Sequence, residues 1–146
     1  MKIIFKICGF ICTVLILMSQ PVYSEEIAVI VNKANPVSKL SMEDVKKFYV
    51  NDQLTWADGK TVSLFDLPTA DSSRQKFSSV IIGKDAEKVA EEWASKKITN
   101  TAKNPPITVK SEILVQERVA KEAGGIGYMP KSKVTSDAVK IVTTFE

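Results

Sequence analysis

Residues 64–77 read LFDLPTADSSRQKF and join a predicted strand to a predicted helix. The strand pattern covers residues 61–67, where β-branched and aromatic side chains are frequent, and it is interrupted at Pro68. Apolar residues then recur at helical spacing from Phe77 onward. The stretch therefore predicts a strand, a polar turn and a helix.

The start of this helix is a candidate anion site. Ser72 and Gln75 have the spacing of a capping box, so we expect the helix to begin at Asp71 or Ser72. A helix N-terminus has unpaired N–H donors and carries roughly half a positive charge. The candidate ligand-binding residues are Asp71, Ser72, Ser73 and Arg74. In the alternative interpretation the turn caps itself, because the Asp71 carboxylate would occupy the position of an anionic ligand.

The first 24 residues have the pattern of a signal peptide. Lys2 and Lys6 flank the start of an apolar run over residues 7–18, and Ser24 stands at a cleavage-site position. The run is shorter than the roughly 20 residues of a transmembrane helix, although an uncleaved N-terminal anchor is the alternative. We expect cleavage near Ser24, a periplasmic or otherwise secreted domain over residues 25–146, and no membrane span after that cleavage.

Composition excludes several kinds of chemistry. Both cysteines, Cys8 and Cys12, lie in the predicted signal peptide, and the chain has no histidine. A disulfide framework, a Cys/His or Ser/His nucleophile and the commonest general base and metal ligand, histidine, are therefore missing from the expected mature chain. We expect no catalytic residues, no cofactor and no metal. A carboxylate pair such as Asp66 with Asp71 is the weaker enzymatic alternative, and either residue could instead accept the proton of a bound phosphate.

Charge balance argues against a nucleic-acid partner. Of the 20 basic residues two, Lys2 and Lys6, lie in the predicted signal peptide, so 18 face 17 acidic residues in the rest of the chain. No basic run stands out, and we expect no nucleic-acid binding.

Strand and helix patterns alternate along the chain. We predict strands over residues 27–31, 61–67, 126–129 and 139–144, and helices over residues 41–49, 72–82, 85–97 and 111–123. This order predicts one α/β domain of three layers with a mixed, mostly parallel sheet. Ligands of such folds bind at the carboxyl ends of strands, where residues 68–74 lie.

Local signals support three of these helices. Ser41 and Asp44 have the spacing of a capping box, and the helix that follows has an apolar stripe of Val45, Phe48 and Tyr49 that we expect to face the core. Gly83 is the expected end of the helix over residues 72–82. In the helix over residues 85–97 we expect Trp93 to be a core residue.

Several short motifs, taken in order, resemble one protein family. They are NPV at residues 35–37, KFY at 47–49, Trp56 before DG at 58–59, DSSRQKF at 71–77 and GGIGY at 124–128. The chain resembles a phosphate-type periplasmic substrate-binding protein of an ABC transporter, which has the type 2 periplasmic-binding-protein fold, shortened to about one lobe. The family's Ser-Gly-Thr turn corresponds to residues 71–73 and its following Arg to Arg74. The resemblance implies that this turn holds an oxyanion.

Two functions follow as expectations. The first is an exported domain that binds phosphate or a related oxyanion at the helix N-terminus, with a membrane ABC permease as partner. The alternative is a structural or partner-binding module that kept the fold and lost the ligand, for which a second copy of the chain is one candidate partner.

Overall fold

The computed structural model describes residues 24–146, and the predicted signal peptide, apart from Ser24, lies outside them. The elements, in chain order, are β1 (Ile27–Asn32), α1 (Met42–Tyr49), β2 (Ser63–Asp66), α2 (Ser72–Phe77), the π-helical turn η1 (Ser78–Ile82), α3 (Ala86–Ile98), β3 (Ile107–Thr108), α4 (Glu112–Lys121), β4 (Gly125–Pro130), the 3-10 turn η2 (Lys131–Lys133) and β5 (Val139–Phe145).

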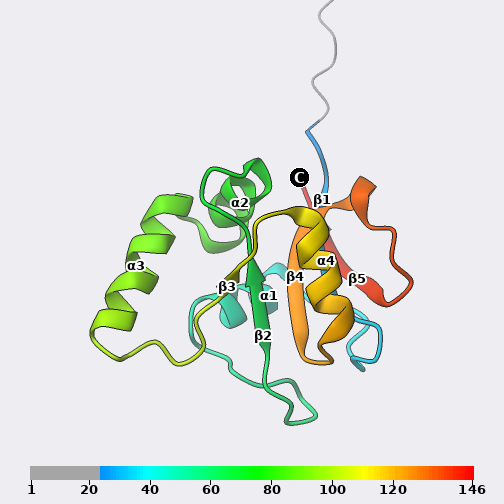
Figure 1. Cartoon of the computed structure of the whole chain (residues 1–146), viewed down its shortest axis with the longest axis horizontal. Coiled ribbons are helices and arrows are strands. Elements are labelled where there is room, and N and C mark those ends of the chain that lie inside the picture. The colour runs from blue at the N-terminus through cyan, green and yellow to red at the C-terminus, as the bar shows by residue number, and fades with distance from the viewer. Residues whose placement is uncertain (1–23) are drawn as a thin grey trace, which may run out of the picture.

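The strands form one five-stranded mixed sheet in the order β3-β2-β4-β1-β5 (Figure 1). β2 is parallel to both β3 and β4, whereas β1 is antiparallel to both β4 and β5. Four strands thus point one way and β1 points the other. The predicted mixed sheet is confirmed. Four of the five strands run in the same direction, but only two of the four pairs of neighbouring strands are parallel, and the other two are antiparallel.

Helices cover both faces of the sheet. The Gly127 face of β4 meets Val115 and Val119 of α4. The next residue, Tyr128, points the opposite way, and its ring stacks on that of Phe77 at the end of α2, with 3.9 Å between ring centroids. All six residues of β1 are buried, as a strand between two helical layers requires. The predicted three-layer α/β architecture is confirmed.

Several local predictions are confirmed at the level of single side chains. Ser41 and Asp44 form the predicted capping box at the start of α1, with both hydrogen bonds present at 3.0 Å. Gly83 ends the helical stretch after α2 with a positive φ of 81°. Trp93 is 7% exposed and packs into the core from α3.

Other local predictions are wrong in detail. The capping side chain of α2 belongs to Asp71, not to a Ser72–Gln75 box, because Gln75 donates to the carbonyl of Thr69 instead. α4 ends at Lys121, two residues before the predicted limit, and β4 continues through Pro130. The two-residue strand β3 was not predicted, since it is too short for a periodic pattern.

Candidate functional site

The candidate site lies at the carboxyl end of β2, where the turn leads into α2. The Asp71 carboxylate accepts hydrogen bonds from the backbone N–H of Ser73 at 2.8 Å and of Arg74 at 3.3 Å. These amides are the ones that an anion at the helix N-terminus would use. The chain therefore supplies its own anion to this helix end.

The two serines of the turn have different surroundings. Ser72 is exposed and, with Lys76, lines an open cavity of about 490 Å³ between α2 and the start of α3, where Asp85 and Glu87 form the other wall. Ser73 is buried, and its hydroxyl donates to Glu112 at the start of α4, at 3.2 Å. Lys133 of η2 donates to the other carboxylate oxygen of Glu112 at 2.5 Å. The carboxylate of Glu112 and the ammonium of Lys133 thus lie beside the start of α2.

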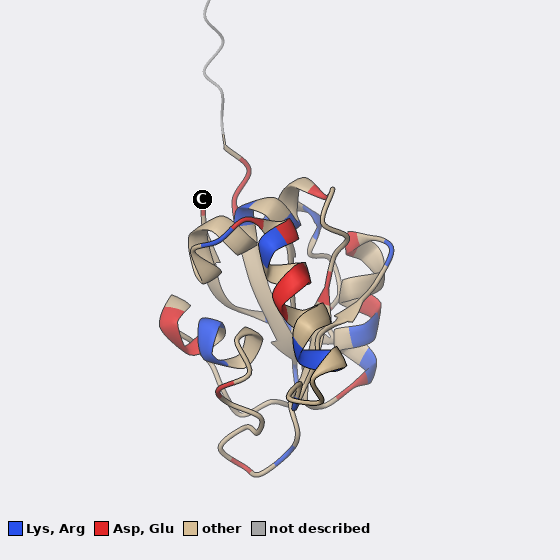
Figure 2. Cartoon of the chain, turned by 90° about the vertical axis from the view of Figure 1, so that its left-hand side faces the viewer, with Lys and Arg blue, Asp and Glu red and all other residues tan. Residues whose placement is uncertain are grey.

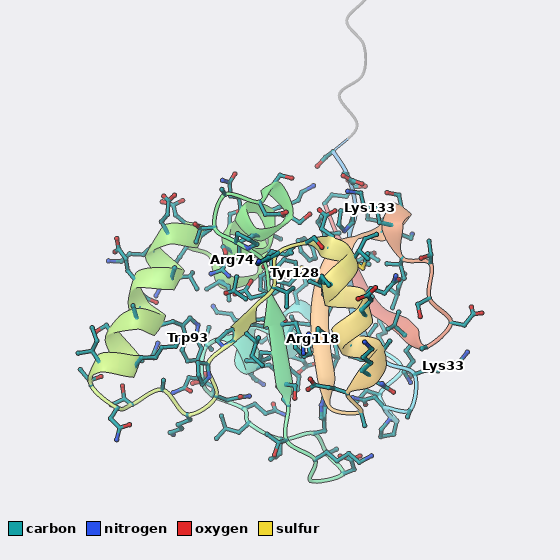
Figure 3. All side chains as sticks on the ribbon, in the orientation of Figure 1. Lys33, Arg74, Trp93, Arg118, Tyr128 and Lys133 are labelled. Carbon is teal, nitrogen blue, oxygen red and sulfur yellow. The ribbon has the colours of Figure 1, made fainter. Side chains whose placement is uncertain are left out.

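Arg74 points into the protein, close to Tyr128 (Figure 3), and forms an ion pair with Asp66 of β2. Both residues of the pair are 4% exposed. The guanidinium also donates to the carbonyl of Leu67 through Nη1 and to the Ser78 hydroxyl through Nε, both at 3.2 Å. The Tyr128 hydroxyl donates to Asp66 Oδ1, which also accepts the Leu67 amide at 3.0 Å.

Burial controls the protonation of this polar cluster. It raises the pKa of Asp66 above its usual range, and the positive charge of Arg74 and the hydrogen bond from Tyr128 oppose that rise. Burial also raises the pKa of the Tyr49 and Tyr128 hydroxyls well above 10, and the nearby Asp66 charge adds to the effect. Both tyrosines therefore remain neutral donors, and Tyr49 donates to the carbonyl of Phe65 at 2.8 Å.

The structure brings the four predicted ligand-binding residues together, but in different roles. Asp71 caps the helix and Ser72 faces solvent. Ser73 donates a hydrogen bond to Glu112, and Arg74 forms a buried ion pair with Asp66. Sequence reasoning missed Glu112, Lys133 and Tyr128, because each comes from an element far from the turn in sequence. The sequence contains one local signal for the buried ion pair. Asp66 lies at the end of an apolar strand, and a carboxylate buried there needs a cation such as Arg74 as its partner.

Residues 24–146 contain no group of three His, Cys, Asp or Glu side chains that could hold a metal ion. Within the same range, no helix has both the length and the apolar character needed to cross a bilayer.

Comparison with known proteins defines the class of the fold. No protein-family model matches the sequence, and no curated protein does. Among solved structures, the chain matches an ABC-type phosphate transport receptor from Vibrio cholerae with a TM-score of 0.64 at 17% identity, covering 81% of this chain and 45% of the receptor. The fold is thus that of about one lobe of a phosphate-binding protein.

Two further structures support the same assignment of fold. A proposed phosphate ABC transporter substrate-binding protein from Clostridium perfringens, with bound phosphate, matches with a TM-score of 0.65 at 20% identity, covering 81% of this chain and 44% of that protein. A proposed phosphate-binding protein from Planctomyces limnophilus matches with a TM-score of 0.62 at 16% identity, covering 81% and 40%. This chain spans less than half the length of each of the three.

Proposed function

We propose that this chain is an exported, non-catalytic module that has the fold of a phosphate-binding lobe and acts through a protein partner. The observation that carries the proposal is the Asp71 carboxylate, which already accepts hydrogen bonds from the amides of Ser73 and Arg74. An oxyanion at that position would stand beside a carboxylate of the same charge. The partner is a membrane ABC permease or a second copy of the chain.

Two further features support the proposal. Glu112 accepts hydrogen bonds from the Ser73 hydroxyl and from Lys133, so two groups suited to an oxyanion already have a carboxylate partner. The matched proteins are also more than twice as long as the part of them that this chain covers. A single wall offers fewer contacts and excludes water less well than a closed site, which lowers affinity for a small ion.

The first test is a thermal melt of residues 25–146 with phosphate, sulfate and chloride at matched ionic strength. A ligand at one hundred times its dissociation constant adds about 2.7 kcal/mol to the free energy of unfolding, which is a rise of several degrees in Tm. We expect no rise specific to phosphate for the wild type. In Asp71→Ser, which removes the carboxylate but keeps a capping hydroxyl, we expect a phosphate-specific rise.

The second test concerns the partner. Light scattering of residues 25–146 measures whether two copies associate, and co-purification with a candidate permease from the cell envelope measures the other association. Monomers in the first experiment and no permease in the second would contradict the proposal. Mass spectrometry of protein recovered from the envelope should give Glu25 as the first residue, which tests the proposed export.

A second candidate function is oxyanion binding for ABC transport. It is favoured by the likeness of the fold to a structure with bound phosphate and by the exposed hydroxyl of Ser72 beside the open cavity, which the half-buried Lys76 also lines. A phosphate-specific rise in the Tm of the wild type, abolished in Ser72→Ala, would establish this function and overturn the first proposal.

A further inference from the structure

A second cavity, of about 240 Å³, lies between α3 and the β2–β3 edge of the sheet. We call it the α3 cavity. Its lining includes Asp66 and Arg74 on one side, Trp93 and Lys97 of α3 on another, and Thr108 of β3. Figure 1 shows α3 beside this edge of the sheet, and Figure 3 shows Trp93 between the helix and the strands. The α3 cavity shares Asp66 and Arg74 with the candidate site, but none of residues 71–73 at the start of α2 lines it.

The buried wall of the α3 cavity offers a donor rather than an acceptor. Asp66 uses Oδ1 for the Leu67 amide and the Tyr128 hydroxyl and Oδ2 for the guanidinium of Arg74. The hydrogen bonds of Arg74 to Leu67 and Ser78 use Nη1 and Nε. Nη2 forms no hydrogen bond with any residue between 24 and 146, so it is the guanidinium nitrogen that can donate to a ligand.

The outer part of the α3 cavity combines apolar walls with one unpaired cation. Ala90, Ala94 and Pro106 line it together with the indole of Trp93. Lys97 is exposed and forms no ion pair with any residue between 24 and 146. In Figure 2 the side of the molecule that carries α3 faces the viewer, and the last turn of this helix is basic, because Lys96 and Lys97 lie there. The charges that line the cavity therefore sum to one positive charge.

We propose that the α3 cavity binds a small carboxylic acid with a flat apolar body. The carboxylate would accept hydrogen bonds from Arg74 Nη2 and attract the ammonium of Lys97, because a guanidinium edge suits a planar carboxylate. The apolar body would pack on the indole of Trp93. A cavity of this volume is smaller than a typical site for a drug-sized ligand, so the ligand has the size of benzoate.

The experiment is a titration of isotope-labelled residues 25–146, followed by amide and indole chemical shifts. Benzoate is the probe, benzamide is its uncharged counterpart, and inorganic phosphate is the small anion without an apolar body. We expect benzoate to shift the amides of residues 66–69 and 93–97 and the indole N–H of Trp93, with a dissociation constant in the range of about 1–10 mM. Benzamide and phosphate should bind at least about threefold more weakly.

Two variants distinguish a direct contact of Lys97 with benzoate from the effect of removing one positive charge anywhere on α3. Lys97→Gln should weaken benzoate binding about threefold, as expected for the loss of one exposed charge contact. Lys88→Gln, on an exposed position of the same helix away from the cavity, is the matched control and should leave the affinity unchanged. Absent shifts at 20 mM benzoate, shifts confined to other residues, or equal binding of benzamide or phosphate would each overturn the proposal.

Discussion

Removing the guanidinium of Arg74 tests the buried ion pair behind the candidate site. In Arg74→Met the Asp66 carboxylate remains buried without its cation, and the Leu67 carbonyl and Ser78 hydroxyl each lose a donor. Breaking a buried pair by removing one partner costs about 3–5 kcal/mol. A domain of about 120 residues has a free energy of unfolding of roughly 6–18 kcal/mol, so the variant should fold but lose a large part of its stability.

Urea denaturation of residues 25–146, followed by circular dichroism, measures this loss. Arg118→Met is the matched control, because Arg118 is the only other arginine in the chain and lies exposed on α4. We expect that control to change the free energy of unfolding by less than about 0.5 kcal/mol. The double variant Asp66→Asn, Arg74→Met removes both charges and should recover part of the loss.

The pH dependence of the Arg74→Met loss provides a sharper check. Burial raises the pKa of Asp66 while Arg74 opposes the rise, so the pKa should rise further in the variant. A carboxyl whose pKa is raised on folding contributes stability below its unfolded pKa of about 3.9 and loses it as pH rises through the folded value. The loss should therefore be smaller at pH 4 than at pH 7. A loss below about 1 kcal/mol at pH 7, or equal losses at both pH values, would refute the reasoning.

Three other substitutions test parts of the fold by the same denaturation assay. Ser41→Ala removes the N-cap of α1 and should cost about 1 kcal/mol, whereas an unchanged midpoint would contradict the cap. The hydrogen bonds from the Ser41 backbone and hydroxyl lower the pKa of Asp44, so its stabilisation is present above the unfolded pKa and is lost as pH falls through the lower folded value. The stability difference between the wild type and Asp44→Asn should consequently shrink from pH 5 to pH 2, and a constant difference would argue against it. Gly127→Ala would place a Cβ 2.4 Å from Val115 Cγ1 and should cost about 1–3 kcal/mol; a cost below 0.5 kcal/mol, on the same rough scale, would be inconsistent with α4 packed on β4.

Local sequence signals were sufficient for most of the fold. β1 was predicted from five successive apolar residues, and α1 from a capping box followed by the stripe Val45, Phe48 and Tyr49, all three of which are buried. Such elements follow from residue patterns that act over a few positions, so their type can be predicted without knowing the neighbours. β3 depends on its pairing with β2 alone, and its two exposed residues carry no such pattern.

The candidate site was harder to predict because its side chains have more than one possible partner. Asp71 and Ser72 are both good N-cap residues, and the choice between them depends on which side chain reaches the amides of Ser73 and Arg74. Arginine is seldom buried without a partner, so the inward direction of Arg74 follows from Asp66 and Tyr128. The tyrosine comes from a strand 54 residues later in the sequence, and no local pattern connects the two.

The position of β1 between β4 and β5 has a consequence for the kinetics of folding. Ile27 pairs with both Pro130 and Phe145, so the first strand of the sheet gains its neighbours only when the last two strands are present. Contacts between residues so distant in sequence require closure of long loops, which slows folding relative to structures built from local contacts. A nascent chain that lacks the last 22 residues, 125–146, would leave β1 without either neighbour. The proposed export would benefit from that delay, since a chain that closes its sheet late is still extended while it crosses the membrane.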